Sequence, residues 1–393
     1  MVRLAKRVTE LPPYLFAQID EAAKRARSRG LAIVHMGIGD PDQDPPEWIR
    51  RILAEEVMRS GNHRYPSYKG HPQLLEAALE YLARRFGIKG LNLDHVCTTI
   101  GSKEGLANLA PAVLNHGDTF IAPDPSYPVF ATLAKQIGAL EVSLPLTAEN
   151  NFAPDPADEL TEYQLQSARV IYLNYPHNPS GCAPNKAYLQ KVIDCAHTYD
   201  LIVVSDLAYA EIYYGAEPPA SLLQLDGALD CVIEFHSFSK SFNMTGWRCG
   251  FAAGQPELIR GLTQIKTNID SGVFNAIQLA MARVLTDPHC DEFLADNRLM
   301  YAKRLDRVLT VLDQLGLEFY RPGGAIYVWC RVPNGDRDSI AWASALLDAT
   351  GLVIGPGRGY GVHGEGWFRL SLTTPDADID RAMEMLAQFM RRK

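Results

Sequence analysis

Short apolar runs alternate with amphipathic segments through the middle of the chain. The apolar runs are rich in β-branched residues and read HVCTTIG, DTFIAPD, RVIYLNYP, LIVVSD, CVIEFHSFS and CGFAAG. Helix-like patterns lie between them, as in SKEGLANLAPAVL, YPVFATLAKQIG and NKAYLQKVIDCAHTYD. Strands this apolar are typical of a parallel sheet that is covered by crossover helices on both faces. Several of the runs end in polar residues, and ligands bind outside the carboxyl ends of such strands.

The pattern changes from about residue 285. A long charged helix pattern leads into GGAIYVWCRV, a further helix at about 339–349, the short segments GLVIGPG and GWFRLSLT, and a closing helix. The turn-rich stretch DPDQDPP (40–46) is unsuited to a helix and indicates a boundary. We therefore predict an α/β protein with a large domain at 45–284, built on a mostly parallel central sheet. Residues 1–44 and 285–393 are expected to form a smaller α+β domain.

Composition excludes several classes of function. The net charge of −8 disfavours nucleic-acid binding, which needs a concentrated basic surface. No apolar run is long enough to cross a bilayer and the first residues lack a signal-peptide core, so we expect a cytoplasmic protein. The seven cysteines show no CxxC spacing and the ten histidines no HExxH pattern, so no metal site is expected. No G-x-S-x-G nucleophile motif and no Walker A motif is present.

Lys240 lies in the run HSFSKSFNMTGWRCGF, directly after an apolar strand. Taken alone it could be a solvated surface lysine. Ser237 and Ser239 beside it, with their backbone N–H groups, suit a phosphate, and Arg248 follows eight residues later. A partly desolvated lysine at such a site can lose its proton and attack a carbonyl.

Other polar residues stand at the predicted ends of strands. Asp206 ends LIVVSD and Tyr209 follows it, Asn178 lies in an NPSG turn, and Ser102 begins a helix after a strand. A helix start with a serine can bind an anion, although the same serine could serve only as a cap. Tyr127 lies in PDPSYPVF and Arg369 in GWFRLSLT. A guanidinium can clamp a carboxylate through two hydrogen bonds, whereas an arginine on an edge strand could simply face solvent.

The run S-x-S-K, followed by G-W-R and framed by these residues in this order, closely resembles the class I and II aminotransferases of fold type I. The resemblance extends over nearly the whole chain. It implies pyridoxal 5'-phosphate (PLP) as cofactor, bound to Lys240 as a Schiff base, and Lys240 as the catalytic base and acid. It further implies that Asp206 pairs with the pyridine nitrogen, that Tyr209 and Asn178 contact the ring oxygen, and that Tyr127 stacks on the ring. The implied phosphate ligands are Ser102, Ser237, Ser239 and Arg248, and Arg369 is the implied carboxylate clamp.

Within this family the segments LPPYLF, MGIGDPD, NHRYPSYKG, GSKEG and NIDSGVF look most like LL-diaminopimelate aminotransferases. That group implies substrate contacts by Tyr14, Gly39, Lys103, Asn178 and Asn268, with Lys103 also beside the cofactor. Tyr65 and Asn268 match positions that reach into the neighbouring subunit's site, so the resemblance implies a homodimer. The reaction expected is amino transfer from an L-amino acid to a 2-oxo acid such as 2-oxoglutarate.

Other functions stay open at this point. Closely similar sequences act on alanine, aspartate or aromatic amino acids. A C–S β-lyase of the same fold would use the same lysine and aspartate but would eliminate rather than transaminate. A non-catalytic regulator on this fold would need a DNA-binding extension, and the chain starts directly at the aminotransferase-like segment.

Overall fold

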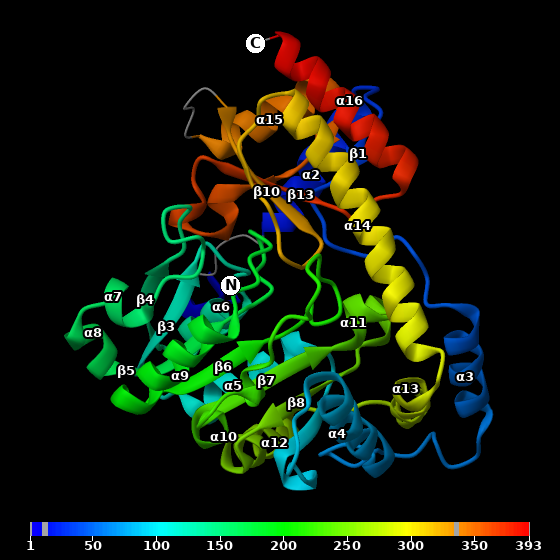
Figure 1. Cartoon of the computed structure of the whole chain (residues 1–393), viewed down its shortest axis with the longest axis vertical. Coiled ribbons are helices and arrows are strands. Elements are labelled where there is room, and N and C mark those ends of the chain that lie inside the picture. Colours follow the sequence, from blue (N-terminus) through cyan, green and yellow to red (C-terminus); the bar gives the residue numbers. More distant parts are fainter. Residues whose placement is uncertain (1, 10–14, 334–337, 393) are drawn as a thin grey trace.

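The structure is a computed structural model, and it describes residues 2–9, 15–333 and 338–392. Its larger part is built on a seven-stranded sheet with the order β2-β8-β7-β6-β5-β3-β4 (Figure 1). β8 runs antiparallel to both of its neighbours, and the other pairs are parallel. The strands of this sheet are β2 (Val96–Thr99), β3 (Thr119–Asp124), β4 (Leu140–Pro145), β5 (Ala168–Leu173), β6 (Ile202–Asp206), β7 (Val232–Ser237) and β8 (Gly250–Gly254).

Successive residues of the inner strands point to opposite faces, and each face has its own core. In β5, Val170 and Tyr172 pack in one cluster, while Ile171 and Leu173 pack in the other. Helices α5 (Ser102–Val113), α6 (Val129–Gln136) and α12 (Pro256–Ile269) cover the first face. Helices α4 (Pro72–Phe86), α9 (Lys186–Tyr199) and α13 (Asn275–Thr286) cover the second. Burial on both faces explains why these strands read as unbroken apolar runs.

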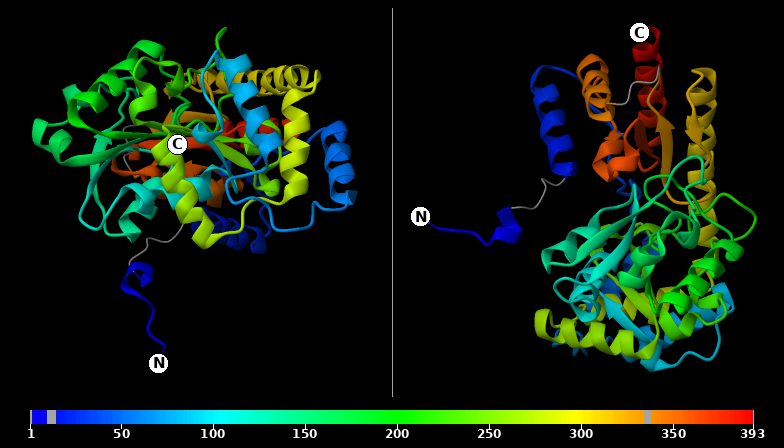
Figure 2. Two further views of the ribbon diagram at one scale, coloured as in Figure 1. Left: turned by 90° about the horizontal axis from the view of Figure 1, so that it is seen from below. Right: turned by 90° about the vertical axis from the view of Figure 1, so that its left-hand side faces the viewer.

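A smaller part lies beyond one end of this sheet (Figures 1 and 2). It holds an antiparallel sheet of order β12-β13-β10-β9 and the parallel pair β1-β11, in which Val34 is opposite Leu352. Its strands are β1 (Val34–His35), β9 (Phe319–Tyr320), β10 (Tyr327–Arg331), β11 (Leu352–Val353), β12 (Gly355–Pro356) and β13 (Trp367–Ser371). Helix α14 (Cys290–Gln314) runs along both parts (Figure 1).

Helix α16 (Asp376–Arg392) covers the small sheet with one apolar face. Its buried residues Ile379, Ala382, Met383, Leu386 and Phe389 recur every three or four positions and therefore form one face. That face packs with α14, α15 (Ser339–Thr350), β10 and β13 in one core. The remaining helices are α1 (Lys6–Thr9), α2 (Leu15–Ser28), α3 (Glu47–Met58), α7 (Pro156–Glu159), α8 (Glu162–Ser167), α10 (Ala228–Cys231) and α11 (Phe238–Ser241).

The α/β fold with a mostly parallel central sheet, predicted from the sequence, is confirmed. The pattern missed β4, because this edge strand exposes Leu140 and Glu141 and so lacks an apolar run. The domain boundaries at 44/45 and 284/285 stay a prediction. Within the described residues, no helix combines the length and apolarity that crossing a membrane requires.

Candidate active site

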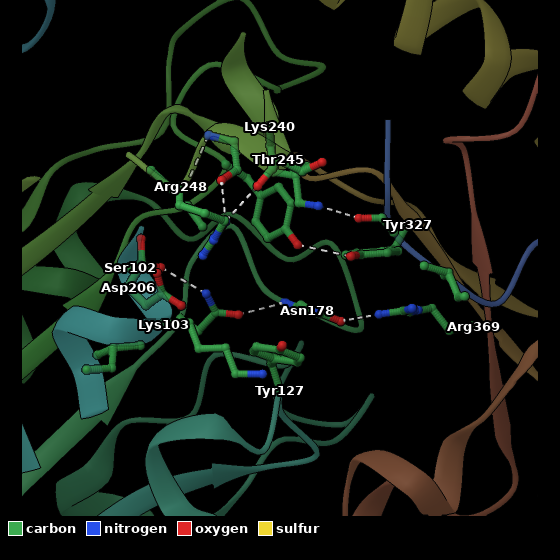
Figure 3. A pocket seen from close by; sticks show the side chains of 18 residues that line it. Ser102, Lys103, Tyr127, Asn178, Asp206, Lys240, Thr245, Arg248, Tyr327 and Arg369 are labelled. Carbon is green, nitrogen blue, oxygen red and sulfur yellow. Dashed lines mark hydrogen bonds between the residues drawn. The ribbon is translucent and has the colours of Figure 1, made fainter. Parts of the chain in front are cut away.

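A cavity of 410 Å³ lies at the carboxyl ends of the parallel strands, facing the small sheet (Figure 3). Four neighbouring strands end at it: β3 leads to Tyr127, β5 to Asn178, β6 ends in Asp206, and β7 leads to Lys240. The chain order of these residues therefore becomes a spatial cluster. The sequence-predicted residues in its lining are Gly39, Ser102, Lys103, Tyr127, Asn178, Asp206, Tyr209, Ser237, Ser239, Lys240, Arg248 and Arg369.

Lys240 is held in the short helix α11, which Ser237 caps by accepting a hydrogen bond from Ser239 N at 3.2 Å. Its Nζ donates to the carbonyl oxygen of Gly39. Burial lowers the pKa of Lys240 to about 8, and the charges of Arg369 and Arg248 act in the same direction. A far larger fraction of this amine is therefore neutral near physiological pH than of an exposed lysine, and the neutral form is the one that acts as nucleophile or base.

One end of the cavity is suited to a phosphate. Helix α5 begins at Ser102, so its free N–H groups point out of the helix at this end. Arg248 lies across the same turn, donating to Ile100 O at 3.2 Å and to Thr245 O at 2.7 Å. Gly101 has a φ of 75°, and a Cβ there would lie 2.6 Å from the Arg248 guanidinium. The close approach of the arginine to this turn therefore requires a glycine.

Asp206 is buried at the floor of the cavity. Burial raises its pKa to about 7, against the opposing effect of the neighbouring Tyr172 and Ser102 hydroxyls. Its Oδ2 lies 3.5 Å from the Tyr172 hydroxyl, whereas no group of the described chain hydrogen bonds its Oδ1. A buried carboxylate oxygen in this state is costly, and a cationic N–H donor would stabilise it. Asn174 ties the floor to the next loop, since its amide donates to Asp206 O and its Oδ1 accepts from Asn178 N.

His177 joins the loops that carry Tyr127 and Asn178. Its Nε2 lies 3.0 Å from Pro125 O and its Nδ1 2.7 Å from Ser180 Oγ. Because a carbonyl can only accept, Nε2 carries the proton and Nδ1 accepts from the serine. Burial lowers the pKa of His177 to about 3, so this link stays neutral over the physiological range.

Arg369 closes the opposite end of the cavity (Figure 3). It lies in β13, between β12 and β10, and is fully buried rather than on an edge strand. Its Nη1 donates to Asn178 Oδ1 at 2.7 Å and its Nη2 to Gly37 O at 2.8 Å. Four cationic side chains and one carboxylate line the cavity, which favours substrates and cofactors with several negative charges.

Gly39 is required by space rather than by backbone conformation. A Cβ at this position would lie 1.9 Å from the hydroxyl oxygen of Tyr327. The cavity is also lined by Tyr327, Thr245 and Asn174, which are not among the site residues predicted from the sequence. Asn174 directly follows β5, so its position at a strand end was the signal that could have found it. Tyr327 is the last residue of the GGAIY segment.

Two of the predicted residues that the structure describes do not line the cavity of this chain. Tyr65 is 87% exposed, and Asn268, also exposed, donates to Gln264 O at 2.9 Å within its own helix. Tyr14 lies outside the described residues. The positions of Tyr65 and Asn268 leave their predicted role in a neighbouring subunit's site untested.

The cavity fits PLP. Ser102, Ser239 and Arg248 line the end that suits its phosphate, and Asp206 Oδ1 is a buried acceptor for its pyridine N–H. Asn178 and Tyr209 line the wall between, and Lys240 supplies an amine with a lowered pKa for its aldehyde. Arg369 remains at the far end for a substrate carboxylate.

The fold and the cavity bring a lysine, an aspartate and an anion site together at the edge of an α/β sheet. A family model described as aminotransferase class I and II matches residues 32–386. The chain belongs to this family, whose members are PLP-dependent aminotransferases.

Relatives match nearly the full length of the chain. An LL-diaminopimelate aminotransferase from Natranaerobius thermophilus is 40% identical over 386 residues, which are 98% of this chain and 99% of the relative. An LL-diaminopimelate aminotransferase from Aquifex aeolicus shows the same identity and coverage. Among solved structures, a double mutant of Thermus thermophilus aspartate aminotransferase superposes with a TM-score of 0.92 at 28% identity, covering 99% of this chain and 100% of that one.

Proposed function

We propose that this aminotransferase moves an amino group between LL-diaminopimelate and a 2-oxo acid such as 2-oxoglutarate. The observation that carries the substrate assignment is the 40% identity to relatives of that name over nearly the full length of both chains. The cavity is compatible with it, because diaminopimelate has a carboxylate at each end. Arg369 can bind the reacting end, and Lys103 is a second cation in the lining for the remote end.

The roles of the cavity residues follow from their positions. Ser102, Ser237, Ser239 and Arg248 would hold the phosphate, Asp206 would accept from the ring N–H, and Asn178 and Tyr209 would donate to the ring oxygen. Tyr127 would pack on the ring, and Gly39 leaves room for the substrate side. When bound, the cofactor supplies an electron sink for the substrate's Cα.

Lys240 would both bind the cofactor and move the proton. Its neutral Nζ would act as the base that takes the proton from the substrate's Cα and, once protonated, as the acid that returns it. Arg369 holds the substrate carboxylate in one orientation while this happens, since two hydrogen bonds already fix its guanidinium. Burial keeps the amine's pKa low enough for this role.

We further propose a homodimer with shared sites. The segments 62–69 and 268–275 form one exposed surface, because Asn275 donates to Arg64 O at 3.2 Å and the rings of His63 and Phe274 lie 5.9 Å apart. This surface exposes Tyr65, Tyr68, Ile269 and Phe274, an apolar patch of the kind that subunit contacts cover. Tyr65 and Asn268 would then reach the partner's cavity.

The substrate is tested with a panel of amino donors and 2-oxoglutarate, followed by glutamate formation and the absorbance of the cofactor. LL-diaminopimelate should give the highest kcat/KM, and Lys240→Ala should abolish turnover, while the exposed Lys186→Ala should not change it. A higher kcat/KM with alanine, aspartate or an aromatic donor would overturn the substrate assignment. Pyruvate release from cystathionine without any oxo acid would instead identify a C–S lyase.

A further inference from the structure

Tyr327 contacts three of the predicted site residues at once. It begins β10, is 3% exposed, and its hydroxyl oxygen lies 3.0 Å from that of Tyr209. The guanidinium carbon of Arg369 lies 3.9 Å from the centre of its ring. Its hydroxyl also fills the space that a side chain at Gly39 would need, and Gly39 accepts the hydrogen bond of Lys240. These contacts join the small sheet to the loop that follows Asp206.

The direction of the hydrogen bond between the two tyrosine hydroxyls follows from the role proposed for Tyr209. A phenol has one proton to donate and can also accept. If Tyr209 donates to the ring oxygen of the cofactor, Tyr327 has to be the donor in the pair. A hydroxyl that accepts such a bond becomes a stronger donor itself, because hydrogen bonds in a chain polarise one another.

The ring of Tyr327 acts on Arg369 in a different way. The Arg369 guanidinium contacts two aromatic rings, and its carbon lies 3.9 Å from the centre of the Tyr327 ring and 4.8 Å from that of Tyr360. Its hydrogen bonds to Asn178 and Gly37 fix the orientation of the guanidinium. An aromatic face beside a buried guanidinium stabilises the charge and blocks other rotamers. The side chain of Tyr327 thus limits where a bound carboxylate can lie.

We propose that Tyr327 is a positioning residue that sets Tyr209 as the donor to the ring oxygen and Arg369 as the carboxylate clamp. The proposal rests on the proposed amino transfer, since it assigns Tyr209 to the cofactor and Arg369 to the substrate. It gives the small sheet a direct effect on the cofactor. The hydroxyl and the ring carry separable parts of this role, and each can be removed alone.

The hydroxyl is tested by Tyr327→Phe in the holoenzyme. A weaker donor at Tyr209 leaves more negative charge on the ring oxygen, so the pKa read from the cofactor's absorbance should rise, by about half a pH unit. In the Tyr209→Phe background, the second substitution should have no further effect. An unchanged pKa in Tyr327→Phe, or an equal additional shift in the double variant, overturns the hydrogen-bond part.

The ring is tested by Tyr327→Leu, using maleate, a dicarboxylate that cannot transaminate. The dissociation constant for maleate should rise about tenfold in Tyr327→Leu and stay close to the wild-type value in Tyr327→Phe. Equal binding by all three proteins overturns the clamp part. If Tyr327→Leu does not fold, a loss of maleate binding by Tyr327→Phe overturns it instead, because that variant retains the ring.

Tyr214→Phe is the matched control. The Tyr214 hydroxyl donates to Ala325 O at 2.7 Å, in the same hairpin but outside the cavity lining. It should leave both the absorbance pKa and maleate binding unchanged, whatever it does to the midpoint of thermal unfolding. A wild type without cofactor absorbance or amine transfer would defeat the proposed function. A normal wild type with unaffected Tyr327 variants would defeat only this inference.

Discussion

Arg369 donates to the side-chain oxygen of Asn178 at 2.7 Å, although 191 residues separate them in the chain. One residue lies in the small sheet and the other follows β5 of the large sheet. The residue proposed to bind the substrate carboxylate is therefore coupled to the residue proposed to contact the cofactor.

Replacing Arg369 by lysine keeps the positive charge but removes the paired N–H donors of the guanidinium. We expect kcat/KM for both the amino donor and the oxo acid to fall by at least about 100-fold, mostly through KM. Steady-state kinetics with both substrates measures this. The control is Arg358→Lys, a partly exposed arginine of the same region, 3.9 Å from Glu365. Wild-type KM values for Arg369→Lys would remove Arg369 from substrate binding.

The lowered pKa of Lys240 predicts how cofactor uptake depends on pH. Only the neutral amine attacks the aldehyde, so the rate of PLP binding to cofactor-free protein should rise with pH and level off just above the pKa of about 8. With an exposed lysine, the rate of PLP binding would keep rising up to about pH 10.4. Stopped-flow absorbance gives the rate at each pH. A rate that still climbs steeply between pH 9 and 10 would contradict the burial of this amine.

The buried carboxyl of Asp206 should lower the free energy of unfolding of the cofactor-free protein at neutral pH. Its pKa rises from 3.8 to about 7 on folding, so the folded state binds more protons than the unfolded state in that window. Stability is therefore lost as pH rises from 4 to 7 and stays reduced above it. Asp206→Asn should be more stable than wild type at pH 8, by up to roughly 4 kcal/mol, and equal near pH 4.

Urea unfolding at several pH values measures this difference. With PLP bound, the order should reverse at pH 8, because the wild-type carboxylate gains the ring N–H as a partner while the amide cannot carry the charge. An Asp206→Asn protein that is no more stable than wild type at either pH would show that this carboxyl ionises normally.

Lys266 forms a buried ion-pair network behind the phosphate end. It is 1% exposed, with Glu104 Oε1 at 2.7 Å and Asp270 Oδ2 at 3.1 Å, and Glu104 also accepts from Ile100 N at 2.6 Å. Lys266→Met leaves two carboxylates without this partner, so it should cost about 3 to 5 kcal/mol in urea unfolding. Arg260→Met breaks an exposed pair with Glu257 and should cost less than about 1 kcal/mol. Equal costs would argue against this network.

Shared sites predict complementation between inactive variants. Lys240→Ala and Tyr65→Ala should each be inactive, and unfolding and refolding them together should restore about a quarter of the wild-type activity. Half of the refolded dimers are hybrids, and each hybrid has one intact site. Sedimentation before and after mixing checks the assembly state. A mixture as inactive as its components would place Tyr65 outside the partner's site.

The sequence by itself determined the α/β class, the strand ends that carry Asn178 and Asp206, and the short motif around Lys240. These features are local, because a strand's burial and a motif's spacing are read from neighbouring residues. The order of the motifs along the chain was enough to predict a PLP-dependent aminotransferase, which the family match confirms.

Only the tertiary structure decided which distant residues meet. It placed Arg369 in a buried central strand beside Asn178, and it brought Tyr327 against Tyr209 and Gly39, contacts that no spacing in the sequence indicates. It also set the pKa values of Lys240 and Asp206, because desolvation depends on everything that packs around a group. The residue types at the strand ends are set by local sequence, whereas the contacts between the large and the small sheet depend on the whole fold.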